Sequence, residues 1–259
     1  MRTDKQAWRQ DGRRQLKNPP EDAFTAWGES DERAGVAPPP IKKPFPEGAT
    51  RVALIAPDEL NLGSMLVAQA IRDRQSRRTF TEEPMTLEEL SFLLWATQGI
   101  RKRHPERPIA FRTVPSGGCR HPYETYLQIE RVEGVPPGLY RYSALDHELV
   151  FLREVRGDAE PTLAEVCHGQ SSVAAAAVTF IWTAIPYRME WRYGPDSPKD
   201  ILLGCGHVCQ NLYLACESVG LGTCAIVAYA QDAMDAYLEL DEDDEITLYV
   251  APVGRPAGE

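Results

Sequence analysis

The chain has 259 residues and a formal net charge of −10 at pH 7, with 43% hydrophobic and 25% charged residues, which is the composition of a soluble globular protein. The excess of acidic residues disfavours general nucleic-acid binding, because nucleic-acid-binding proteins normally present a basic surface. No run reaches the roughly 18 apolar residues that a membrane helix needs. Since the first fifteen residues also lack an apolar stretch, we expect no membrane association, no secretory signal and a cytoplasmic location.

Residues 1–53 are predicted to be a polar, proline-rich extension. The segment contains Pro19, Pro20, Pro38, Pro39, Pro40, Pro44 and Pro46. A segment of this composition cannot bury enough apolar surface to form a core. We therefore expect it to lie over the surface of the folded part or over a partner subunit, and we predict one folded domain over residues 54–259.

Two helices are predicted at the start of this domain. Apolar residues recur at helical spacing over residues 66–71, and Arg74 falls on the same face, which we expect to be the inner one. In the second helix, Thr86 and Glu89 have the spacing of a capping box, and Gly99 is suited to the C-cap.

The rest of the domain mixes strands and helices. Residues 124–155 alternate as strands with a hairpin turn at Asp146 and His147, and residues 174–185 form an apolar run typical of a buried strand. A helix over about 201–218, a strand-like stretch at 223–229, a short helix near 231–238 and a last strand over 246–254 follow. No regular βαβ alternation is present and no G-x-G-x-x-G follows a strand, which disfavours a Rossmann nucleotide site.

The cysteines and histidines do not indicate a metal centre. Cys205, Cys209 and Cys216 follow one stripe of a predicted helix, so we expect buried, reduced thiols rather than metal ligands. His207 in the same helix has apolar neighbours and is expected to be a core residue.

Residues 71–80, IRDRQSRRTF, concentrate positive charge in an acidic chain. Arg72, Arg74, Arg77 and Arg78 surround Ser76. A solvated helix end would explain the cluster, because basic residues favour the last turn of a helix. A site for an anion would explain it equally well.

Two further stretches have the same ambiguity. In the sequence VPSGGCRHP, residues 114–122, glycines would let backbone N–H groups approach a planar or anionic ligand, although a plain surface loop has the same composition. Arg255 in the terminal APVGRPAGE is, taken alone, a solvated side chain.

The order of these stretches is more informative than each stretch alone. An R-x-S-x-R-x-F motif ends at Phe80, a P-S-G-G-x-x-x-P turn spans residues 115–122, a G-H-x-x-Q-N-L helix spans 206–212, and P-V-G follows near the end. Together they resemble the nitroreductase family of FMN-dependent flavoproteins over residues 60–256. The turn and the G-H-x-x-Q-N-L helix resemble its SagB-type dehydrogenase branch, which includes azoline oxidases that mature thiazole and oxazole peptides.

This resemblance implies an α+β fold, a homodimer and a cofactor. The expected fold has a mixed, mainly antiparallel central sheet flanked by helices, with FMN bound between two subunits. The implied cofactor-binding residues are Arg74, Gln75, Ser76, Arg78, Pro115, Ser116, Gly117, Gly118, Val227, Ala228 and Arg255. Arginine and hydroxyl groups suit a phosphate of charge near −2. By the same resemblance, the backbone of Val227 and Ala228 would face flavin N5, and residues 116–118 would come from the other subunit.

The candidate catalytic residues are Tyr193 and Arg192. The azoline oxidases have a Lys-Tyr pair, proposed to do acid–base work, where this chain has Arg192 and Tyr193. Arginine stays protonated near neutral pH and cannot replace lysine as a base, whereas Tyr193 can donate or relay a proton.

Three functions are compatible with the sequence. The first is an FMN-dependent oxidoreductase that transfers hydride through flavin N5, with NAD(P)H or a substrate as donor. The second is an azoline-type dehydrogenase of peptide natural products, and the third is a non-catalytic protein that binds or sequesters FMN. The partners implied are a second copy of the chain and a small-molecule or peptide substrate.

Overall fold

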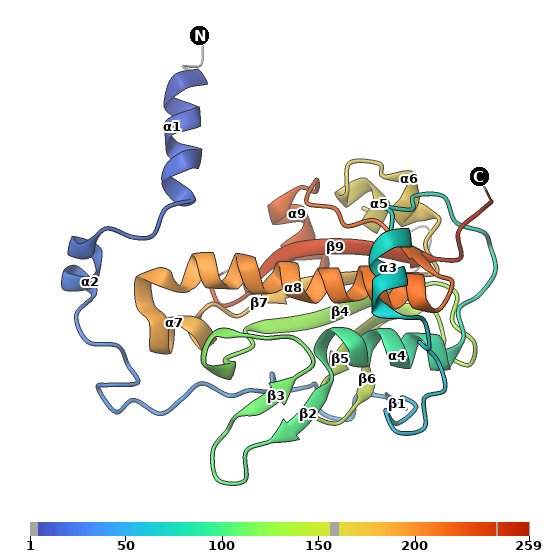
Figure 1. Cartoon of the computed structure of the whole chain (residues 1–259), viewed down its shortest axis with the longest axis horizontal. Helices are drawn as coiled ribbons and strands as arrows, with labels where there is room; N and C mark the ends of the chain where they lie inside the picture. The colour runs from blue at the N-terminus through green and yellow to red at the C-terminus, as the bar shows by residue number, and fades with distance from the viewer. Residues whose placement is uncertain (1–4, 156–160, 242, 259) are drawn as a thin grey trace.

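A seven-stranded sheet forms the centre of the computed structural model, which describes residues 5–155, 161–241 and 243–258 (Figure 1). The strand order is β1-β6-β5-β4-β7-β9-β8. The strands are β1 (Arg51–Ala53), β4 (Tyr123–Ile129), β5 (Gly138–Ser143), β6 (Glu148–Arg153), β7 (Val178–Ala184), β8 (Gly222–Thr223) and β9 (Ile246–Gly254). Neighbouring strands pair antiparallel throughout, which confirms the predicted α+β class and mainly antiparallel sheet. A separate hairpin joins β2 (Ile100–Arg103) to β3 (Ala110–Arg112).

The middle strands divide the core into two layers. Every residue of β7 is buried, which confirms the strand predicted from the apolar run. Because successive side chains of a strand point to opposite faces, Leu127 and Trp182 belong to one core cluster while Tyr126 and Ile181 belong to the other. The predicted hairpin of β5 and β6 is also present, with His147 at positive φ in its turn.

Helices α4 (Leu87–Gln98) and α8 (Ser197–Ser218) cover the first face of the sheet (Figure 1). The Thr86–Glu89 capping box at the start of α4 and the C-cap at Gly99 are confirmed. Helix α8 begins earlier than the predicted residue 201, with Pro198 in its first turn, where the missing N–H of proline costs no hydrogen bond. Within the described ranges, no helix combines the length and hydropathy that crossing a bilayer requires.

The second face is covered by α5 (Leu163–Val166), α6 (Ser171–Ala174) and α9 (Gln231–Tyr237). The strand-like stretch at 223–229 pairs less than predicted. It contributes Thr223 to β8 and one isolated bridge from Ile226 to Val250. Its remaining residues form a loop beside the end of α8.

The N-terminal extension contains two helices that the sequence did not indicate, α1 (Lys5–Gln15) and α2 (Glu21–Trp27). After α2 the chain lies along the surface of its own domain. Lys43 forms an ion pair with Glu245, and Arg141 donates to the carbonyl of Pro44 and lies over the Phe45 ring. The extension ends in β1, which pairs with β6 as an edge strand of the main sheet.

Helix α3 (Val67–Asp73) corrects one prediction. Ala70 is buried, but Leu66, Val67 and Ile71 are 73%, 69% and 60% exposed. The apolar face of α3 is therefore not an inner face of the single chain. A hydrophobic period shows that a face is suited to burial without showing what covers it.

Candidate active site

The predicted cofactor-binding residues at the end of α3 converge on Tyr213 of α8. The Arg74 guanidinium lies 5.3 Å from the centre of the Tyr213 ring, and Ser76 Oγ is 3.2 Å from the Tyr213 hydroxyl. That hydroxyl also accepts a hydrogen bond from the Ala225 backbone N–H, at 2.8 Å. Tyr213 thus ties the 74–76 stretch to the loop that carries Val227 and Ala228.

Sequence reasoning did not single out Tyr213. It lies directly after the G-H-x-x-Q-N-L motif, but a tyrosine on an apolar helix has no distinctive pattern. Its bonding role depends on residues far away in the chain.

The arginines of the cluster separate into two kinds. The Arg77 backbone N–H donates to Thr223 O, and its guanidinium forms an ion pair with Glu217 at 3.5 Å, so Arg77 has a structural role. Arg78 is exposed and Arg74 half-buried, and neither has a carboxylate partner within the described part of the chain. Both guanidiniums are therefore available to hold an anion, beside Ser76 and its contact with Tyr213. Gln75 in the arginine stretch and Ala228 in the loop after β8 are also exposed, and Val227 is 71% exposed.

We call this first group, residues 74–78, Tyr213 and 225–228, the arginine half-site. Its donor set combines guanidiniums, a hydroxyl and solvent-accessible backbone. Such a set suits a phosphate group next to a polar ring.

The glycine turn and the catalytic candidates form a second group. The turn carries the short 3-10 helix Gly117–Cys119, and α7 (Tyr187–Tyr193) ends in Arg192 and Tyr193. A Cβ on Gly118 would lie 2.9 Å from the Tyr193 hydroxyl oxygen and 3.0 Å from Arg192 Cδ, and Gly118 has φ of +53°. Only glycine fits this close approach without strain. The turn and the Arg-Tyr pair, distant in sequence, are therefore one structural unit, which we call the glycine half-site.

Ser116 stabilises the turn from within. Its Oγ accepts a hydrogen bond from the His121 backbone N–H at 3.0 Å. Burial, together with the positive charges of Arg112 and Arg120, lowers the pKa of His121 to about 3. His121 is therefore neutral near pH 7 and contributes no charge to the site. Pro115 is exposed at the start of the turn.

The N-terminal extension also contacts the glycine half-site. Glu32 forms an ion pair with Arg192 at 2.7 Å. A Cβ on Gly194 would lie 2.8 Å from Trp27 Nε1, so Trp27 packs directly against the residue after Tyr193. The charge of Arg192 is thereby compensated by a carboxylate of its own chain.

The two half-sites lie near opposite ends of α8. Asp200 of α8 is close to Gly117, because a Cβ there would be 3.5 Å from its Oδ2. Tyr213 is thirteen residues further along the same helix, or about 20 Å at 1.5 Å per residue. One chain therefore does not bring the arginine and glycine half-sites together.

Helix α3 packs across α8 in Figure 1, and the two helices expose apolar side chains. The members of this exposed apolar face are Leu66, Val67, Ile71, Leu202 and Leu203. Gly206 on α8 has no atom within 4 Å of a would-be Cβ, and His207 beside it is exposed rather than buried as predicted. Exposed apolar side chains on two helices that pack against each other are typical of an interaction site.

Arg255 is placed differently from the other predicted cofactor residues. Its guanidinium forms ion pairs with Glu83, at 2.9 Å, and with Glu89, at 3.0 Å. These contacts fasten the end of the chain to the start of α4. These ion pairs give the Arg255 side chain a structural role, which competes with its predicted role in cofactor binding.

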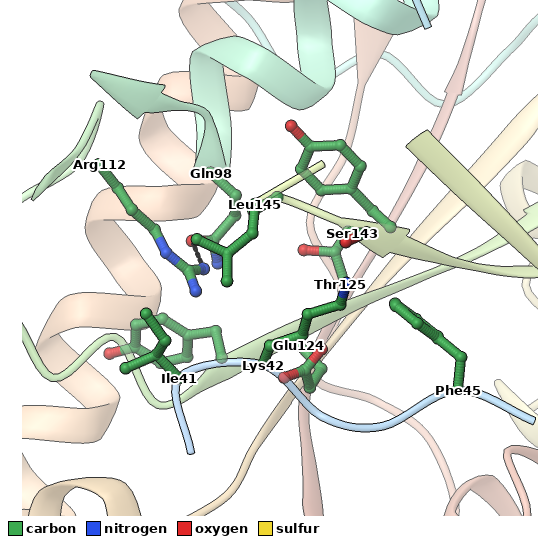
Figure 2. Close-up of a pocket in the computed structure, with 12 residues that line it drawn as sticks. Ile41, Lys42, Phe45, Gln98, Arg112, Glu124, Thr125, Ser143 and Leu145 are labelled. Carbon is green, nitrogen blue, oxygen red and sulfur yellow. Dashed lines mark hydrogen bonds between the residues drawn. The ribbon is translucent and has the colours of Figure 1, made fainter. Parts of the chain in front are cut away.

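A small polar cavity lies between the extension and the start of β4. Figure 2 shows Arg112 and Gln98 pointing into it, with Lys42 and Phe45 supplied by the extension. Arg112 Nη1 donates to Gln98 Oε1 at 2.7 Å, and burial lowers the pKa of Arg112 to about 10. The cavity measures about 20 Å³, which is room for a water molecule. It is too small for a cofactor.

The helical cysteines are buried, as predicted. Cys205, Cys209 and Cys216 are free and buried, and burial raises the pKa of the Cys205 and Cys209 thiols to about 12. Such thiols are unreactive. Among the described residues, no group of His, Cys, Asp and Glu side chains is arranged to hold a metal ion.

Comparison with known proteins gives the family. The Nitroreductase family model matches residues 71–255. "Putative nitroreductase MJ1384" of Methanocaldococcus jannaschii is 32% identical over 198 residues, covering 76% of this chain and 92% of that protein. "Trifolitoxin operon protein TfxC" of Rhizobium leguminosarum bv. trifolii is 26% identical over 230 residues, covering 84% of this chain and 63% of that protein.

Solved structures show the same fold. A "putative nitroreductase (reut_a1228)" from Ralstonia eutropha JMP134 superposes with a TM-score of 0.65 and 26% identity, covering 85% of this chain and 99% of that one. Two others share the fold at lower identity. One is a Desulfovibrio desulfuricans nitroreductase in complex with FMN (TM-score 0.51, 21% identity, 75% of this chain and 88% of that one). The other is the E. coli microcin synthetase McbBCD complex with truncated pro-MccB17 bound (TM-score 0.60, 17% identity, 93% and 84%).

The matched region contains both half-sites, from Arg74 in the first to Tyr193 in the second. The resemblance read from four short motifs is thereby confirmed over most of the chain. This chain therefore belongs to the nitroreductase family of oxidoreductases.

Proposed function

We propose that the protein is a homodimeric FMN-dependent oxidoreductase, with the cofactor held between an arginine half-site of one subunit and a glycine half-site of the other. The observation that carries this proposal is the placement of two incomplete half-sites at opposite ends of α8. The exposed apolar face lies beside the same helix. Two-fold pairing of identical faces is self-complementary, and it would place each half-site of one copy near the other half-site of its partner.

The residues of the arginine half-site fit FMN. Arg74, Arg78 and Ser76 have the donors for a phosphate, since neither arginine is already paired within the described residues. A positive charge beside the ring would also stabilise negative charge on the reduced cofactor. The backbone of Val227 and Ala228 is exposed and is proposed to face the flavin N5 side.

The glycine half-site fits a flat ligand. Gly117 and Gly118 leave the surface of the turn without side chains, so Tyr193 is the first side chain behind them. When bound, FMN supplies a ring that accepts and releases hydride. Tyr193 is placed to hold or deliver a proton, and Arg192, compensated by Glu32, supplies charge and position but not a base.

A second candidate is the azoline-type dehydrogenase of the SagB-type branch. TfxC, named for a trifolitoxin operon, matches 84% of this chain, and the microcin synthetase complex shares the fold. In such a reaction an azoline ring loses one hydride and one proton and gains a double bond. Dioxygen would take the two electrons and two protons. Tyr193 would then act near the proton that leaves the ring.

The first test is cofactor binding. We expect protein as purified, or after FMN titration, to show the visible absorption of bound flavin with one FMN per chain. Arg74→Ala and Arg78→Ala should weaken FMN binding about ten- to a hundredfold, the cost of a lost charged hydrogen-bond partner. Arg72→Ala is the matched control and should bind like wild type, because Arg72 is exposed outside the half-site. Protein that takes up no FMN, or equal losses in all three variants, would contradict the proposal.

Turnover separates the remaining functions. Oxidation of NAD(P)H with a quinone or nitroaromatic acceptor supports the general oxidoreductase. Dioxygen-dependent oxidation of a thiazoline peptide supports the azoline dehydrogenase. A protein that binds FMN and turns over none of these is the non-catalytic binder.

A further inference from the structure

A pocket on the second face of the sheet lies between the N-terminal extension and the end of α9. It has a volume of about 340 Å³, within the size range of small-ligand sites. Tyr126, Leu139 and Leu238 of its lining belong to the core cluster of the second face. Tyr193 and Tyr213 of the two half-sites pack instead against the cluster of the first face. The pocket is therefore separate from the proposed FMN site.

Arg141 of β5 is the buried cation of this pocket. It is 3% exposed and has no carboxylate partner among the described residues. Its Nη2 donates to Pro44 O and, at 3.4 Å, to Lys43 O, while its Nε has no hydrogen-bond partner within the described ranges. The guanidinium lies 4.3 Å from the centre of the Phe45 ring. Carbonyl groups and a ring face solvate a charge without neutralising it, and a buried charge is unfavourable unless it is paired.

The other charges that line the pocket are matched. Lys43 forms an ion pair with the buried carboxylate of Glu245. Arg153 Nε lies 3.6 Å from Glu239 Oε1, and the Glu239 side chain is 76% exposed. Arg141 therefore leaves the pocket with one uncompensated positive charge. One positive charge suits a monoanion, whereas the two carboxylates would repel a dianion such as phosphate.

Most of the remaining lining is apolar. It consists of Pro44, Phe45, Pro46, Leu139, Leu152 and Leu238. An inorganic anion would leave these walls uncovered, whereas an acid with a short hydrocarbon chain would cover them and gain from the hydrophobic effect. Guanidinium groups bind carboxylates through charge-assisted hydrogen bonds. Charge and walls together therefore favour an organic acid over a bare anion.

We propose that this pocket binds a small aliphatic monocarboxylate, with its carboxylate at Arg141 and its hydrocarbon chain against the prolines and leucines. Residues 43–46 of the extension form one wall and Leu238, at the end of α9, forms part of another. The bound acid would therefore join the N-terminal extension to the domain. The inference does not depend on the proposed function, because the pocket shares no residue with either half-site.

Binding of hexanoate tests the proposal. The comparisons are hexanamide, which has the same chain without the charge, and inorganic phosphate, which has charge without a chain. Calorimetry with full-length protein preincubated with FMN, at pH 7 and constant ionic strength, should show one hexanoate per chain. Hexanoate should bind at least tenfold more tightly than either comparison. The visible spectrum of bound flavin should not change, since the pocket and the half-sites lie on opposite faces of the sheet.

Two variants locate the binding. Arg141→Gln removes the charge and should weaken hexanoate binding about ten- to a hundredfold, as for other lost charged hydrogen bonds. Pro46→Glu keeps Arg141 and adds a carboxylate on the exposed wall of the pocket. Its repulsion should weaken hexanoate binding about threefold or more. This second variant also decides the matter should Arg141→Gln fail to fold.

The matched control is Arg51→Gln. Arg51 also lies over the Phe45 ring, at 5.7 Å, but does not line the pocket, so its replacement should leave hexanoate affinity unchanged. Wild-type affinity in either pocket variant, equal weakening by Arg51→Gln, binding of hexanamide or phosphate as tight as that of hexanoate, or no binding of hexanoate to wild type would overturn the inference. Protein that takes up no FMN yet binds hexanoate through Arg141 would contradict the proposed function and support this inference.

Discussion

Tyr193 is the side chain on which the proposed chemistry depends. A Cβ on Gly118 would lie closer to the Tyr193 hydroxyl oxygen than to any other atom. Arg192 beside it stays protonated near neutral pH and cannot act as the base. We expect Tyr193→Phe to lower kcat by about a hundredfold, because a positioned proton donor contributes about that factor or more. FMN affinity should be unchanged, since the phenol hydroxyl is not assigned to the cofactor.

Steady-state kinetics and FMN titration on the same preparation check this prediction. Arg192→Lys is the companion variant, because it keeps the positive charge opposite Glu32 and restores the Lys-Tyr pair of the azoline oxidases. Tyr193→Phe that turns over at the wild-type rate would show that the Arg-Tyr pair has no proton-transfer role.

At the scale of elements, the turn over residues 115–121 contains a buried histidine that makes the stability of the fold depend on pH. His121 is buried with φ of +42°, and its pKa is lowered to about 3 from the ordinary 6.5. Below pH 6.5 the unfolded chain binds a proton that the folded chain does not, so the free energy of unfolding falls as pH falls from 6.5 toward 3. At pH 5 this histidine alone lowers the free energy of unfolding by about 2 kcal/mol.

Replacing His121 by asparagine removes the titrating imidazole and keeps a residue type that tolerates positive φ. We expect the unfolding free energy of His121→Asn, measured by urea denaturation, to depend less on pH between 4 and 6.5 than that of wild type. His168→Asn is the matched control and should leave the pH dependence unchanged, because His168 is exposed and, like His121, has a positive φ. Identical pH profiles for wild type and His121→Asn would contradict the assignment.

For the molecule as a whole, the exposed apolar face predicts association. Leu203 on α8 is 58% exposed within that face, so Leu203→Asp should place a charge in the proposed subunit interface. We expect sedimentation velocity to show a dimer for wild type and a monomer for this variant, with loss of tight FMN binding because the half-sites separate. Leu16→Asp is the control, because Leu16 is 75% exposed outside this face. A monomer that retains FMN as tightly as wild type would refute the shared site.

Local patterns were sufficient for much of the fold. The Thr86–Glu89 capping box, the β5–β6 hairpin, the buried β7 run and the cysteine stripe of α8 all followed from sequence. Each depends on contacts within a few residues or on one period of hydrophobicity. The family resemblance followed for a related reason, because its motifs are short stretches with a defined order.

The tertiary structure decided which distant residues meet. That Tyr213 joins Ser76 to Ala225, that Gly118 packs on Tyr193, and that Trp27 packs on Gly194 could not be read from the sequence. The apolar face of α3 was recognised, but its exposure was not. Periodicity and motif order report what a segment can bury or bind, whereas long-range packing of the whole chain selects the partner, and no local pattern of residues carries that information.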